Sequence, residues 1–293
     1  VEGAFGDALA CVGMEEEEKL HKELREKLQE KLSRAARETE GTPPEHKYLM
    51  GLAYLGGIDV EVDHERAVRL IQSAAEADLP EAMERLVTMY RNGEAVERDY
   101  QAAIQWQERL VDVRRAAYQE TQGEDELWDV LEALNYLGEY LREQALLEAA
   151  GEAYAEMVCL AEASEYKSQG KIALGLFWGH TDFGRIQSKF GKLETAHEEF
   201  QKALGIAEPL ANETGAVQAR RALSVSYNAL GDVESALGHP DRARDYYAKS
   251  LELSEALAEE TGTVEARRDL SISYERMGDV EIALGHPDRA RNY

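Results

Sequence analysis

The chain has 293 residues, of which 58 are acidic and 33 basic, so its formal net charge is −25 at pH 7, and 44% of its residues are apolar. This composition excludes collagen-like, mucin-like and disulfide-stapled proteins and argues against wholesale disorder. Because a phosphate-binding surface needs an excess of cations, nucleic acid and anionic membranes are not expected as partners.

The cysteine content and the hydropathy pattern both concern location. Cys11 and Cys159 lie far apart in the sequence, a usage typical of a reducing compartment. The sequence has neither a run of about 18 apolar residues nor a basic and then apolar secretory leader at its start. We therefore expect a cytoplasmic location. The first residue is Val1 rather than methionine, which predicts that the chain is part of a longer or processed polypeptide.

The N-terminal segment, residues 1–43, predicts one amphipathic helix over residues 15–40. Leucines recur every four residues from Leu20 to Leu32, and glutamates alternate with lysines or arginines at helical spacing. One leucine stripe with charged neighbours is typical of a surface helix.

Residues 44–120 contain a short repeat. Five residues recur at an offset of 36: Tyr54, Gly57, Val60, Asp63 and Ala67 return as Tyr90, Gly93, Val96, Asp99 and Ala103. We therefore expect two related units in this part of the chain.

Residues 121–293 contain a longer repeat. Residues 213–246 and 260–293 are identical at 25 of 34 positions, at an offset of 47. Gly184, Gly231 and Gly278 follow the same offset, and Gly138 continues the series at an offset of 46. The pattern predicts four repeats, of which the last is incomplete.

Each long repeat is expected to form a helix, a turn and a second helix. Gly238 can adopt the left-handed conformation that ends a helix, and Pro240 suits the first turn of the next one. Small residues at Gly231 and Ala243 would let the two helices approach closely. Because one hairpin cannot bury its apolar face alone, neighbouring hairpins must stack into a solenoid.

These spacings carry a family resemblance. Leu230-Gly231, Gly238, Ala243, Tyr247 and Ser250 resemble the tetratricopeptide repeat, in an elongated form of about 47 residues. The two upstream units resemble Sel-like repeats. Together the resemblance covers roughly residues 44–293 and implies an all-α, right-handed helical-hairpin solenoid, a tetratricopeptide-like superhelix.

The resemblance also implies a binding surface, because the first helices of such repeats line a concave groove that takes a peptide or a helix. The positions of this sequence that would face a partner are Asn135, Arg142, Trp178, Thr181, Arg185, Val225, Asn228, Asp232, Ser235, Ile272, Glu275, Asp279 and Ile282. The basic and asparagine pattern that lets some family members clamp a peptide carboxylate is not reproduced, so no such clamp is expected.

The two near-duplicate repeats give an independent indication of where this binding surface lies. Of the nine positions at which the two copies differ, six (218, 222, 225, 228, 229 and 235) fall within about 140° of arc around the helix. That arc contains the expected groove face. Either each repeat was altered where it contacts a ligand, or the residues of an exposed face changed without any binding role. The sequence leaves both explanations open. Trp178 with Phe177 is the candidate aromatic anchor. The alternative is that one or both rings fill the core between repeats, which is favoured for Phe177.

No residue pattern predicts catalysis, a metal site or a cofactor. His239 and His286 occupy equivalent turns of successive repeats, too far apart to share one metal, and are expected to be surface turn residues. The arginine pairs Arg220-Arg221 and Arg267-Arg268 could form a basic ladder for an acidic partner, but pairing between repeats is favoured.

The sequence thus predicts a non-enzymatic scaffold that binds a protein or peptide partner. The alternative is a sensor or regulatory arm of a larger bacterial signalling or defence protein whose catalytic domain lies outside this chain. The sequence stops at Tyr293, before the last repeat has a complete second helix. Self-association through this uncapped C-terminal repeat is a further expectation.

Overall fold

The computed structural model describes residues 42–58 and 60–293, so the helix expected at residues 15–40 lies outside the described residues. The chain divides into two compact units, Val1–Val113 and Arg114–Tyr293, which we call unit 1 and unit 2. The division falls within helix α6 (Tyr100–Thr121). Each unit is described by itself.

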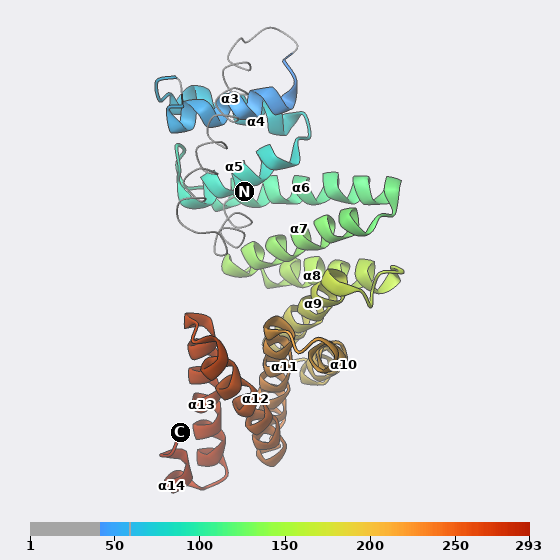
Figure 1. The fold of residues 1–293 in the computed structure, drawn as a ribbon, viewed down its shortest axis with the longest axis vertical. Helices are drawn as coiled ribbons and strands as arrows, with labels where there is room; N and C mark the ends of the chain where they lie inside the picture. The colour runs from blue at the N-terminus through green and yellow to red at the C-terminus, as the bar shows by residue number, and fades with distance from the viewer. Residues whose placement is uncertain (1–41, 59) are drawn as a thin grey trace. The chain divides into compact units, whose positions relative to one another are not determined.

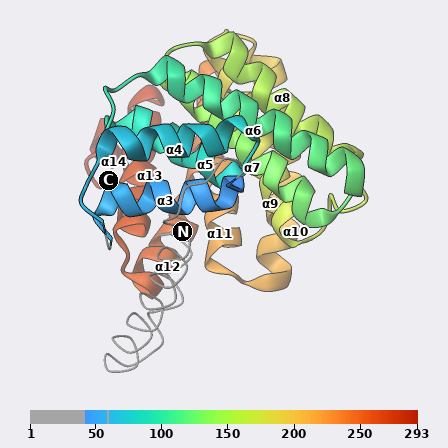
Figure 2. The same cartoon turned by 90° about the horizontal axis from the view of Figure 1, so that it is seen from above.

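Unit 1 consists, in its described part, of α3 (Pro44–Gly56), α4 (His64–Glu76), α5 (Pro80–Asn92) and the first half of α6. α3 packs against α4, and α4 packs against α5. Both ribbon views show α3 and α4 side by side (Figures 1 and 2).

The 36-residue period of unit 1 reflects helix ends. Asp63 Oδ1 accepts a hydrogen bond from the backbone N–H of Arg66 at 2.9 Å, so Asp63 caps the start of α4. Asp99 accepts bonds from two backbone N–H groups at the start of α6 in the same way. Gly57 and Gly93 end α3 and α5 with φ angles of 65° and 73°, which glycine adopts without strain. The recurring aspartates and glycines therefore mark where helices start and stop.

Unit 2 is a series of antiparallel helix pairs that follows the second half of α6. Its helices are α7 (Glu124–Glu143), α8 (Leu147–Ala163), α9 (Gly170–Lys189), α10 (Leu193–Thr214), α11 (Val217–Ala236), α12 (Pro240–Thr261), α13 (Val264–Ala283) and α14 (Pro287–Ala290). From α7 onwards each helix packs against the next, and α9 also contacts the neighbouring first helices α7 and α11 (Figure 1). The described residues contain no strand. The predicted fold class, an all-α right-handed solenoid of helical hairpins, is confirmed.

The recurring glycine of each first helix makes room for an aromatic ring of the second helix. A Cβ atom added to Gly231 would lie 2.3 Å from a ring carbon of Tyr247, closer than carbon atoms can pack. The same arrangement occurs three times, always at a separation of 16 residues: Gly138 with Tyr154, Gly184 with Phe200 and Gly231 with Tyr247. The ring lies where a side chain would otherwise be, so the two helices of a pair can approach closely.

The turn between the helices is the one expected from the sequence. Gly238 has a φ of 81°, in the left-handed region, and Pro240 is the first residue of α12. Gly285 has the same φ of 81° before Pro287 and α14. These two residue types therefore fix the end of one helix and the start of the next.

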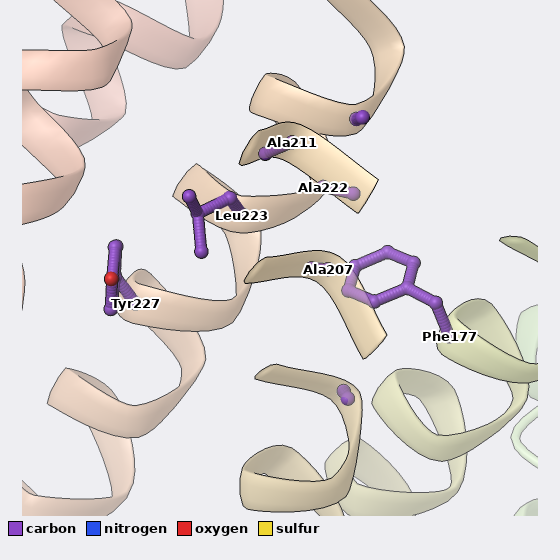
Figure 3. Close-up of a cluster of buried hydrophobic side chains, with 8 residues drawn as sticks. Phe177, Ala207, Ala211, Ala222, Leu223 and Tyr227 are labelled. Carbon is purple, nitrogen blue, oxygen red and sulfur yellow. The ribbon is translucent and has the colours of Figure 1, made fainter. Parts of the chain in front are cut away.

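Successive pairs are joined by buried side chains. Phe177 of α9 is fully buried in a cluster with alanines of α10 and with Ala222 and Leu223 of α11. Figure 3 shows the Phe177 ring pointing from α9 toward Ala207 of α10. Burying such a ring contributes about 1.5–3 kcal/mol to folding. Phe177 thus fills the core between repeats, as expected, and its neighbour Trp178 is left only half-buried.

Candidate functional site: a groove along the first helices of unit 2

One groove of about 760 Å³ runs across unit 2. It is lined by residues of α7, α9, α11 and α13, the first helices of four consecutive pairs, and by Phe200 of α10. The resemblance places the binding surface on these same helices.

Seven of the expected residues line this groove: Arg142, Trp178, Arg185, Val225, Asn228, Asp232 and Ile272. Asp232 also lines a smaller crevice of about 340 Å³, together with Ser235, Glu275 and Asp279. Among the described residues, Asn135 and Ile282 line neither cavity; Asn135 is half-buried on α7 and Ile282 is exposed on α13.

Thr181 does not face the groove. Its side chain is fully buried, and its hydroxyl donates to the backbone oxygen of Phe177 at 2.8 Å. A small side chain whose hydroxyl bonds to its own helix packs well between helices. The expectation that Thr181 contacts a partner is therefore replaced by a structural role.

Several groove residues were not expected from the resemblance, yet the repeat comparison contained a signal for them. Besides the expected Ile272, α13 contributes Glu265, Arg268, Asp269 and Arg276 to the groove. All of these except Arg268 occupy positions at which the two near-duplicate repeats differ. The differences between the copies thus concentrate on the groove wall, whereas Lys189 of α9 lines it without any such signal.

Two of these differences create ion pairs between α11 and α13. Asp269 replaces the equivalent of Ala222 and accepts a hydrogen bond from Arg221 Nε at 2.6 Å. Arg276 replaces the equivalent of Ala229 and donates two bonds to Asp232, at 2.7 and 2.8 Å. These hydrogen bonds raise the pKa of both guanidinium groups. At these two positions the divergence is explained by contacts between repeats and needs no ligand.

The arginine pairs behave differently in the two copies. Arg220 bonds to Glu260 at 2.6 Å, and Arg221 bonds to Asp269. Arg221 therefore pairs with the next repeat, as expected, whereas Arg220 of α11 pairs with α12, the second helix of its own pair. Within residues 42–58 and 60–293, Arg267 and Arg268 have no ion pair.

Asp232 also accepts a hydrogen bond from α12, the second helix of its own pair. The hydroxyl of Tyr247 donates to Asp232 Oδ1 at 2.9 Å. Burial, and then the charge of Asp232, raise the pKa of Tyr247, so its hydroxyl stays a donor at physiological pH. Asp232 thus ties α11 to α12 and α13 at the edge of the groove.

Three half-buried apolar side chains form a row along the groove: Trp178, Val225 and Ile272, which we call the apolar row. They are 47 residues apart and so occupy equivalent positions on α9, α11 and α13. The Trp178 ring is held edge-on against Phe177, with centroids 4.8 Å apart. A rigid aromatic ring on a fixed support is typical of residues that dominate binding energy at interfaces.

Asn228 adds an unpaired polar group to the same surface. Its Oδ1 is buried without a hydrogen-bond partner, and its amide nitrogen has no partner either among the described residues. Buried polar atoms in folded proteins are almost always hydrogen-bonded, so each exception calls for an explanation. A carboxamide can both donate to and accept from a peptide backbone, which makes Asn228 suited to hold an extended segment.

His239 and His286 each pair with a glutamate of the preceding helix. His239 Nδ1 bonds to Glu234 Oε2 at 2.8 Å, and His286 Nδ1 bonds to Glu281 Oε2 at 3.0 Å. Both histidines lie in turns before helices, as expected. In the part of the chain that the structure describes, no cluster of three or more His, Cys, Asp or Glu side chains is arranged to hold a metal ion. None of the described helices is both long and apolar enough to cross a bilayer.

Comparisons with known proteins agree with this architecture. The tetratricopeptide repeat profile matches residues 221–292, and the Sel1 repeat profile matches residues 47–79 and 80–109. No curated protein gives a significant match.

Solved structures resemble the chain at low identity. The Podosopora anserina putative kinesin light chain with nearly identical TPR-like repeats is 15% identical, with a TM-score of 0.51 over 73% of this chain and 92% of that one. The apo form of RapI is 10% identical, with a TM-score of 0.51 over 85% and 94%. A Sel1 repeat protein from Oxalobacter formigenes is 19% identical, with a TM-score of 0.44 over 94% and 97%. For the two structures with a TM-score of 0.51, the likeness is one of fold.

Repeats of these two kinds mediate protein–protein interactions and are generally not catalytic. The residue spacings, the hairpins and the profile matches lead to one assignment: this chain carries Sel1 repeats followed by tetratricopeptide repeats.

Proposed function

We propose that this chain is a non-enzymatic scaffold that binds a segment of a partner protein in the groove of unit 2. The observation that carries the proposal is the lining of the groove. It combines the apolar row with Asn228, whose amide has no partner in the described part of the chain, on the first helices of consecutive repeats.

The groove suits a peptide better than a small molecule. Small-molecule sites are usually enclosed pockets of about 300–1,000 Å³ with few polar groups. This groove draws its walls from helices of four repeats and mixes apolar, charged and amide side chains along them. An extended segment could pack apolar side chains on the row and bond its backbone to Asn228.

Peptide selection tests the proposal even though the partner is unidentified. The purified chain would be used to select binders from a displayed library of random peptides of about 16 residues. Fluorescence anisotropy would then measure the affinity of the selected peptides. We expect Trp178→Ala and Asn228→Ala each to weaken binding by about tenfold or more, as is typical of central interface residues.

Two variants provide matched controls. Trp128 is half-buried on α7 and Asn212 is exposed on α10, and neither lines the groove. Trp128→Ala and Asn212→Ala should leave the affinity unchanged. Selected peptides that bind equally well to the two groove variants and to the controls would refute the proposal.

A scaffold of this kind fits a cytoplasmic protein, and the free thiol of Cys159 is compatible with a reducing compartment. The alternative role, a sensor or regulatory arm of a larger signalling or defence protein, stays a prediction, because such an arm would use the same groove.

A further inference from the structure

The groove has a charge balance opposite to that of the whole chain. Six cationic and four anionic side chains line it, whereas the chain as a whole has 58 acidic and 33 basic residues. Charges act mainly within a Debye length, about 8 Å at physiological ionic strength. A ligand inside the groove therefore meets this local excess of cations more strongly than the distant negative charge.

Half of these cations have no hydrogen-bond or ion-pair partner among the described residues. Three are paired: Arg185 with Asp182, Arg221 with Asp269 and Arg276 with Asp232. Arg142, Lys189 and Arg268 make no side-chain hydrogen bond or ion pair with any residue that the structure describes. The groove therefore contains three cations that take part in no ion pair between described residues, beside the carboxylates of Glu139 and Glu265.

Arg142 and Lys189 lie in the last turns of α7 and α9. A cation there also stabilises its own helix through the helix dipole, but that local role does not require either residue to line a shared groove.

Beyond Asp232, the smaller crevice contains Glu275 and Asp279, and neither has an ion pair among the described side chains. An acidic ligand is thus attracted toward α7 and α9 and repelled from the crevice.

We infer that the occupant of the groove is an acidic segment of a partner protein that also carries an apolar side chain. This inference rests on the proposed function and specifies its ligand. The carboxylates of the segment face Arg142 and Lys189, and the apolar side chain packs on Trp178. A nucleic acid strand also carries negative charge, but it would extend beyond the groove over a chain of net charge −25, which opposes its binding.

Charge reversal with a matched control tests this inference. Arg142→Glu with Lys189→Glu reverses two groove cations, and Lys167→Glu with Arg267→Glu makes the same charge change at exposed residues outside the groove. The probes are a fluorescein-labelled peptide selected by the unmodified chain and a charge-swapped version of it, in which Asp and Glu are replaced by Lys.

We expect the selected peptides to contain more Asp and Glu than Lys and Arg. The unmodified chain and the control variant should bind the acidic peptide at least about tenfold more tightly than the charge-swapped one. The groove variant should instead bind the charge-swapped peptide more tightly than the acidic one. If the substitutions merely disrupted the ends of α7 and α9, binding would be lost, and no such gain would be seen. Raising the salt from about 0.1 M to about 1 M shortens the Debye length from about 10 to about 3 Å and should weaken binding of the acidic peptide.

The outcomes separate this inference from the proposed function. Selected peptides that are neutral or basic, yet still need Trp178 and Asn228, would overturn the acidic ligand and leave the scaffold role intact. Failure to select any groove-dependent peptide would overturn both. An oligothymidine strand that binds as tightly as the acidic peptide, and is lost in the groove variant, would show that the groove takes nucleic acid instead.

Discussion

Replacing Gly231 with alanine tests the contact that holds the two helices of a pair together. The new Cβ would lie 2.3, 2.6 and 2.9 Å from three ring carbons of Tyr247, whereas ordinary contacts begin near 3.4 Å. The Tyr247 ring is buried, and its hydroxyl is bonded to Asp232, so it cannot move without breaking that bond. The alanine should therefore push α11 and α12 apart.

The expected size of the effect follows from three contributions. Overpacking a core costs about 1–3 kcal/mol, and losing the Tyr247–Asp232 hydrogen bond costs about 0.5–1.5 kcal/mol. Alanine returns about 1 kcal/mol because it favours the helix more than glycine does. The net loss of stability is about 2 kcal/mol, which lowers the Tm of a unit of this size by about 4–8 °C. Circular dichroism at increasing temperature measures it.

Gly205 provides the matched control. It lies in α10, is exposed, and a Cβ added to it would meet no atom within 4 Å. Gly205→Ala should therefore stabilise the protein by about 0.5–1 kcal/mol through helix propensity alone. Tyr247→Leu should reduce the cost of Gly231→Ala by removing the ring. Equal stabilisation by Gly231→Ala and Gly205→Ala would show that the helices of a pair do not approach as described.

Three further predictions concern contacts within and between the helix pairs. Phe177→Ala should destabilise unit 2 by about 3–5 kcal/mol in urea denaturation, because it empties a fully buried site; a cost below about 1 kcal/mol would contradict that burial. Although burial acts to raise it, hydrogen bonds from His180 and Lys202 hold the pKa of Glu199 below its usual value. The stability that Glu199 contributes is thus present above about pH 4.5 and lost at lower pH. The loss of unfolding free energy caused by Glu199→Gln should therefore shrink as the pH falls through this range. A loss that does not change with pH would show that the ionisation of Glu199 is not coupled to folding. A double-mutant cycle of Arg276→Ala and Asp232→Ala should give a coupling of about 0.5–1 kcal/mol that falls at about 1 M salt, and no coupling would mean that this pair does not join the repeats.

The repeat architecture could be predicted because its determinants are local and recur. Gly238 and Pro240 set the turn, and apolar residues at helical spacing set the buried face. Each of these requirements acts within a few residues and returns with every repeat, so two periods, of 36 and 47 residues, were enough to define the hairpins.

The role of Gly231 was anticipated as close helix approach, but its specific reason needed the structure. The ring it accommodates belongs to Tyr247, 16 residues later on another helix. A helical period does not show which side chain of the second helix reaches that point, because this depends on how the two helices cross.

The groove was predicted less completely, for a related reason. The repeat frame placed Trp178, Val225 and Ile272 on one face, and they do line the groove. It also placed Thr181 there, but Thr181 is fully buried and its hydroxyl donates to the backbone of its own helix. Sequence spacing assigns a residue to a face of its own helix, and the helices packed beside it decide how much of that face stays exposed.

The charges of the groove were decided by tertiary structure alone. In the sequence, Arg221 and Lys189 are both cations on first helices. Asp269, 48 residues further along, neutralises Arg221, whereas no described residue pairs with Lys189. The sequence itself determined the hairpins and their order, since these follow from contacts within one repeat. Which charges are left to meet a partner depends on contacts between repeats, and only the folded chain brings those residues together.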